Sequence, residues 1–156
     1  MEMVYAIEGA KVITSVEEQD AIVLSQYTTI TQDAVEFEGE IVLDNSQLKV
    51  VDGVVEYDAE AVAEQVKRRL IQGYKQDRDK ALNNNTVEML EHEFDARPQD
   101  LSNIQLGIEK DETLWPDVND YMVDVTVSDL QTLLSTGITQ GEKIWDDYKQ
   151  GVKAIQ

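Results

Sequence analysis

Short runs rich in valine, isoleucine and other β-favouring residues, separated by polar residues and glycine, occur in the first third of the chain, which is typical of β-strands. Six such runs occur, at residues 4–7, 11–14, 35–37, 40–43, 47–51 and 54–57. Asp52-Gly53 separates the last two, and an Asp-Gly pair favours the two-residue turn of a hairpin. Residues 15–18 (Ser-Val-Glu-Glu) match a capping box, which predicts a short helix over about residues 16–26. The pattern therefore predicts an antiparallel β-rich lobe over residues 1–57.

The apolar spacing changes to three and four residues after Asp58, and this predicts a helix of about six turns that ends at Leu82. Three asparagines follow, and asparagine tolerates the left-handed conformation that ends helices. The same reasoning predicts, in chain order, a hairpin at 86–94, a helix opened by Pro98 and a strand at 121–127. The fold class is therefore α+β: an N-terminal antiparallel β-rich lobe, then a domain at 58–156 built as helix, hairpin, helix, strand and long helix.

The last predicted element is a long amphipathic helix that begins at a capping box, Ser128-Asp129-Leu130-Gln131. Its apolar residues recur by four and three positions, like a heptad seam of about three repeats. The candidate packing or interface residues on this stripe are Leu134, Ile138, Trp145, Tyr148, Val152 and Ile155. Two interpretations stay open. The stripe packs on the helix at 58–82 within one subunit, which we favour because three repeats are the minimum for a coiled coil, or it forms a seam between subunits.

The composition is strongly acidic, with 32 Asp and Glu against 13 Lys and Arg and a net charge of −19. Such a surface repels phosphate backbones and anionic lipids, so we expect neither a nucleic acid nor a membrane as partner. Residues 1–57 are the more acidic part, since they contain only Lys11 and Lys49 as basic residues. The chain has no cysteine, which excludes disulfides, thiolate metal sites and a cysteine nucleophile. It also has no long apolar run and no secretory signal pattern.

Motifs with catalytic or metal-binding patterns are weak. His92 lies between two glutamates on a predicted strand, and we interpret it as a solvated residue rather than a metal ligand or base. Residues 117–120 resemble the start of a calcium loop, but Met122 and Ser128 stand where the loop needs glycine and glutamate. Residues 137–143 are one residue short of a phosphate loop and lie within the predicted helix. No nucleophile elbow, zinc-protease motif or dinucleotide fingerprint occurs. We therefore expect no enzyme, no cofactor and no metal.

A series of residues in the second part of the chain has a recognisable order and spacing. These residues are Arg69, Phe94-Asp95, Asn103-Ile104, Trp115, Val125-Thr126 and Leu130. With them, residues 58–156 resemble a domain family of unassigned biochemical activity. The family occurs near the C-termini of tailed-bacteriophage tail proteins and of tail-fibre and tail-fibre-assembly proteins. Residues 1–57 lie outside the resemblance.

The resemblance implies a non-enzymatic structural or adaptor component of a phage tail, attached at the tail fibre or baseplate. The implied partners are other tail, fibre or baseplate proteins and further copies of the chain, with a trimer favoured because tails have rotational symmetry. The implied location is the tail of the virion, and the host cytoplasm during assembly. From its position, we expect the lobe at 1–57 to dock on a neighbour. One alternative is a tail-fibre assembly chaperone, and a further one is an acidic DNA mimic that inhibits a host protein.

Overall fold

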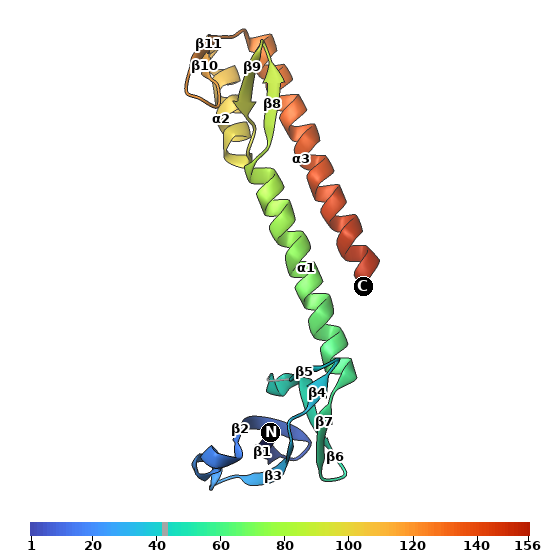
Figure 1. The fold of residues 1–156 in the computed structure, drawn as a ribbon. Coiled ribbons are helices and arrows are strands. Elements are labelled where there is room, and N and C mark those ends of the chain that lie inside the picture. The colour runs from blue at the N-terminus through green and yellow to red at the C-terminus, as the bar shows by residue number, and fades with distance from the viewer. Residues whose placement is uncertain (42–43) are drawn as a thin grey trace. The chain divides into compact units, whose positions relative to one another are not determined.

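The computed structural model describes residues 1–41 and 44–156 (Figure 1). The chain divides into two compact units, Met1–Arg68 (unit 1) and Arg69–Gln156 (unit 2). The division falls within helix α1 (Ala59–Asn83), so this helix contributes to both units. An antiparallel sheet comes first in the chain and the long helices follow, which confirms the predicted α+β class.

Unit 1 is built on a five-stranded antiparallel sheet with the order β3-β1-β2-β6-β7. Its strands are β1 (Glu2–Glu8), β2 (Lys11–Glu17), β3 (Thr28–Asp33), β6 (Leu48–Val51) and β7 (Val54–Tyr57). Two short strands, β4 (Glu36–Phe37) and β5 (Glu40–Ile41), and two 3-10 helices, η1 (Glu18–Leu24) and η2 (Asn45–Gln47), complete it. The predicted hairpin at β6 and β7 is confirmed, because Asp52 and Gly53 both adopt positive φ, at 52° and 77°.

Three predictions for unit 1 need correction or completion. The short helix predicted at 16–26 is present as the 3-10 helix η1, but it begins only at Glu18, because β2 continues to Glu17 and Ser15 pairs with Tyr5 in the sheet instead of capping a helix. Strand β3 was not predicted, because Ile30 is the one apolar residue in its threonine-rich run. The strand predicted at 40–43 is described as β5 at Glu40–Ile41, and residues 42–43 lie outside the described residues.

A single side chain joins the two outer strands of the sheet. The Gln32 amide on β3 donates to the Val55 carbonyl on β7 at 2.7 Å, and its oxygen accepts from the Val55 N–H at 2.8 Å. The amide therefore supplies hydrogen-bonding partners that an outer strand otherwise lacks. Beneath it lies the larger core of unit 1, made of Met3, Tyr5, Val12, Leu48 and Val55. The other sheet face carries a smaller cluster of Val4, Ala6 and Leu24, in which η1 supplies Leu24.

Unit 2 contains the second part of α1 and the elements that follow it. These are β8 (Thr86–Met89), β9 (His92–Asp95), α2 (Pro98–Glu109), β10 (Leu114–Pro116), β11 (Met122–Asp124) and α3 (Val127–Ile155). The predicted hairpin and the helix opened by Pro98 are confirmed. The predicted strand at 121–127 is shorter, and it pairs with β10, which was predicted as a turn. The cap of α3 is Thr126, two residues before the predicted one, because its hydroxyl accepts from the Asp129 N–H at 3.1 Å.

The core of unit 2 lies between the β8–β9 hairpin, α2 and the first half of α3. Its buried members are Val87, Phe94, Ala96, Ile104, Val123, Val125, Leu130 and Leu133. Gly137 lets α3 approach closely here, since a Cβ at this position would lie 2.7 Å from Leu101 Cδ2. The N-terminal half of α3 is therefore fixed by a core, and its C-terminal half extends beyond that core beside α1 (Figure 1). No helix among the described residues is long and apolar enough to span a bilayer.

Candidate protein-interaction surfaces

The stripe predicted on the last helix lies along α3, and its six residues differ in burial. Leu134 is partly buried against the unit 2 core. Tyr148, Val152 and Ile155 are half-buried, and Ile138 and Trp145 are each 41% exposed. None of the six is as buried as Leu130 and Leu133, which are 0% and 1% exposed. The stripe is therefore a partly covered surface and not a closed core.

Two of the stripe residues contact the second part of α1. Trp145 and Tyr148 meet edge to face, with ring centroids 5.8 Å apart. The Arg78 guanidinium lies over both rings, with Cζ 4.4 Å from the Trp145 centroid and 4.6 Å from that of Tyr148. The Arg78 side chain is 12% exposed, and it also pairs with Asp79 at 2.6 Å. A cation held over two aromatic faces in this way stabilises the contact between the helices.

A glycine allows the same two helices to approach one turn further on. A Cβ on Gly151 would lie 2.5 Å from Tyr74 Cε1, so this ring packs directly on the α3 backbone. We call residues 69–83 of α1 and 138–155 of α3 the helical arm. A cleft of about 270 Å³ runs along the arm, lined by Tyr74, Asp77, Arg78, Ala81, Ile144, Asp147 and Tyr148. Despite these contacts, Leu70 remains 46% exposed and Tyr74 38% exposed.

Unit 1 has its own outward-facing apolar residues, on η1. Ile22 is 83% exposed and Val23 63% exposed, although the next residue, Leu24, is buried against the sheet. We call Ile22 and Val23 the η1 knob. Glu18, in the first turn of η1, lies against Glu2 on β1, and its hydrogen bond and negative charge raise the pKa of Glu2. The knob therefore projects from a surface on which negative charges are crowded.

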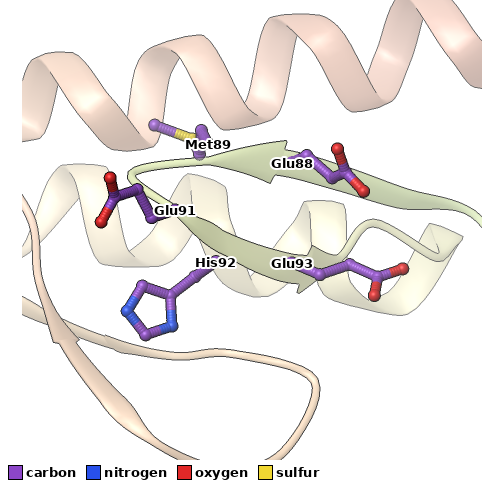
Figure 2. Close-up of a pocket in the computed structure, with 5 residues that line it drawn as sticks. All are labelled: Glu88, Met89, Glu91, His92 and Glu93. Carbon is purple, nitrogen blue, oxygen red and sulfur yellow. The ribbon is translucent and has the colours of Figure 1, made fainter.

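A third feature is the pocket at the β8–β9 turn, of about 540 Å³ (Figure 2). It is lined by Glu88, Met89, Glu91, His92 and Glu93. The turn itself is Leu90-Glu91, and both residues adopt positive φ, at 53° and 59°, although neither is a glycine. Such a conformation costs roughly 1–2 kcal/mol per residue. Figure 2 shows Glu91 pointing away from Glu88 and Glu93, so the acidic side chains do not converge.

His92 has a specific partner, which corrects its interpretation as a solvated strand residue. Its Nδ1 lies 2.8 Å from Asp117 Oδ2. The Asp117 side chain is 5% exposed, and its Oδ1 accepts from the N–H groups of Asn119 and Tyr121 at 2.8 and 3.0 Å. The hydrogen bond from His92, and then these two backbone donors, lower the pKa of Asp117 against the opposing effect of burial. The pair fastens the loop after β10 to the β8–β9 hairpin.

Replacing Asp117 by asparagine tests this role. Because the folded-state pKa of Asp117 is lowered, its ionised form stabilises unit 2 above the normal titration range of aspartate, and that contribution is lost as the pH falls through the lowered value. We expect Asp117→Asn to melt at a lower temperature than wild type at pH 7, with the difference shrinking towards pH 3. Asp120→Asn, in the same loop but exposed, is the control and should match wild type. A constant gap across this pH range would contradict the argument.

The hydrogen bond of His92 with Asp117 joins two segments of unit 2 that lie far apart in the sequence. No group of three or more histidine, aspartate or glutamate side chains within 1–41 and 44–156 is arranged to hold a metal ion. Sequence reasoning missed Asp117 as the partner of His92, since 25 residues separate them. It also gave no signal that Arg78 would lie over two aromatic rings of α3. The nearest sequence signal for the η1 knob is the run Ile22-Val23-Leu24 in an acidic stretch.

Comparisons of the chain with known protein families, with curated proteins and with solved structures found no match.

Proposed function

We propose that this chain is a non-enzymatic structural or adaptor component of a bacteriophage tail, and that it works by binding neighbouring tail proteins. The phage assignment rests on the resemblance of residues 58–156. The observation that carries the adaptor role is the η1 knob, where two adjacent apolar side chains project from unit 1. Burying an isoleucine or valine side chain contributes about 1.5–3 kcal/mol, so a partner surface gains considerably by covering both.

The surroundings of the knob indicate the chemistry of its partner. Residues 1–57 contain twelve acidic side chains against two lysines. A partner that crowds further negative charge against this surface is disfavoured, and one with lysine or arginine around an apolar pocket is favoured. We therefore expect the partner to be a protein surface with an apolar pocket and a basic rim. Such a contact would fasten unit 1 to the tail and leave unit 2 free for other contacts.

Co-purification tests the proposal. The tagged chain is co-expressed with the tail, fibre and baseplate proteins of the phage that encodes it, and the captured proteins are identified by mass spectrometry. We expect one of these proteins to co-purify with the wild type. The Ile22→Ser/Val23→Ser variant should capture at least about tenfold less of this protein, which corresponds to about 1.4 kcal/mol of binding free energy. Val54→Ser is the matched control, because Val54 is 52% exposed in unit 1 but lies outside the knob.

Two results would overturn the proposal: capture of no tail protein by the wild type, or equal capture by the wild type and the knob variant. A further measurement separates a structural part from an assembly factor. Mass spectrometry of purified particles should detect the chain in a fixed ratio to the tail proteins. Binding to a tail protein without any presence in the particles would replace the structural role by that of an assembly chaperone.

A further inference from the structure

The helical arm consists of two helices with one seam between them and no further layer of the same unit over it. Its contacts include those of Tyr74 with Gly151 and of Arg78 with Trp145 and Tyr148. Apolar side chains remain exposed on both helices, namely Leu70, Tyr74, Ile138 and Trp145. A helix that is apolar beyond one seam normally packs on a further element, and two paired helices are completed as a bundle by another pair.

The charge distribution indicates which element covers the arm. The arm carries seven basic and five acidic side chains, whereas the rest of the chain carries six basic and twenty-seven acidic ones. Two copies of this protein repel each other over most of their surface, because like charges brought together are costly. At the arm the charges are nearly balanced, so this repulsion is small. A second copy can therefore approach here and bury its own exposed apolar residues in the same contact.

Opposite charges on the arm are also placed for a two-fold contact. Arg69 and Asp77 each lie four residues from Gly73, on either side of it, and neither forms an ion pair with any residue in 1–41 or 44–156. A Cβ placed on Gly73 would meet nothing within 4 Å, so the helix surface is open at this point. When two copies of a helix cross antiparallel at one residue, the position four before it on one copy faces the position four after it on the other.

We propose that the partner of the arm is a second copy of this chain, docked antiparallel on α1 with the crossing at Gly73. Leu70 and Tyr74 of each copy are covered by the other, and Arg69 of each copy pairs with Asp77 of the other. The contact is isologous, so both ion pairs form by the same symmetry operation. Four helices, two from each copy, then make one bundle. This proposal uses unit 2 alone and does not depend on the η1 knob or on the identity of a tail partner.

Molar mass in solution tests the proposal. Sedimentation equilibrium of the full chain over a range of concentrations should reach twice the 17.6 kDa of one chain. We expect Leu70→Lys to weaken association by at least about tenfold, because it removes a leucine that the second copy covers and places a charge in that apolar contact. Gln72→Lys adds the same charge at an exposed site two residues along and should associate like wild type. Both changes use good helix formers at exposed positions, so circular dichroism should show an unchanged fold.

A charge exchange tests the two-fold geometry. Arg69→Asp and Asp77→Arg, made singly, each place like charges opposite one another and should weaken the dimer. The double variant restores opposite charges at both sites and should recover most of the affinity. A mass of one chain at all concentrations, or of three chains, would overturn the proposal. Failure of the double variant to recover, or equal damage by Gln72→Lys, would overturn it as well. We expect the Leu70→Lys variant to capture tail proteins like wild type. The dimer at the arm and the tail contact at the η1 knob are therefore tested independently.

Discussion

Replacing Asn85 by alanine is expected to lower the free energy of unfolding of unit 2 by about 1–3 kcal/mol. Asn85 follows the end of α1 and is 9% exposed. Its side-chain Nδ2 donates to the Ala96 carbonyl at 3.0 Å and to the Gly137 carbonyl at 3.3 Å. Alanine cannot replace either bond. The Gly137 carbonyl keeps its hydrogen bond within α3, but the buried Ala96 carbonyl loses a donor, which costs about 1–3 kcal/mol. The loss therefore acts at the junction of α1, the β8–β9 hairpin and α3.

Denaturant titration followed by tryptophan fluorescence measures this loss, because both tryptophans, Trp115 and Trp145, lie in unit 2. Asn84→Ala is the matched control. Asn84 is the same residue type one position earlier, but it is exposed, so its replacement should change the unfolding free energy by less than about 0.5 kcal/mol. Equal losses for the two variants would show that Asn85 acts through the end of the helix and not through its two carbonyl partners.

The elements that could be predicted from the sequence are those fixed by neighbouring residues. Asp52-Gly53 sets the turn between β6 and β7 through backbone conformation alone. Asp58 begins α1, because its Oδ1 accepts from the Glu60 and Ala61 N–H groups at 3.1 and 3.2 Å. Pro98 fits the first turn of α2 in the same local way. Each of these signals is complete within a few residues, so no tertiary contact is needed to read it.

The elements that were missed depend on distant partners. Strand β3 has few apolar residues, and it forms because β1 offers a full row of backbone partners from Glu2 to Ile7. Charge explains why α3 is capped by Thr126 and not by Ser128. Thr126 is followed at the third position by Asp129, whose carboxylate accepts from the Thr126 N–H at 2.8 Å, whereas Ser128 is followed by the neutral Gln131. A charged acceptor makes the stronger hydrogen bond.

The sequence predicted the apolar stripe on α3, but it did not predict how far each residue of the stripe is buried. Along its first half, α3 packs on α2 and β8, and along its second half it lies beside α1. A repeat of four and three residues assumes one partner over the whole length. The more buried residues Leu133, Gly137 and Ile144 each lie one position before Leu134, Ile138 and Trp145 of the predicted stripe. The η1 knob could not be predicted for a related reason, because sequence alone does not say which of three consecutive apolar residues faces outward.

Adjacent leucines on α3 test this shift of register. Leu133 is 1% exposed within the unit 2 core, whereas Leu134, the first residue of the predicted stripe, is partly buried at its edge. We expect Leu133→Ala to lower the unfolding free energy of unit 2 by about 3–4 kcal/mol, and Leu134→Ala by about 1–2 kcal/mol, because a cavity forms in full only where the neighbours enclose it. Denaturant titration of both variants measures the difference. A larger loss of unfolding free energy for Leu134→Ala than for Leu133→Ala would contradict this argument, because it would show that the predicted stripe itself lies in the core of unit 2.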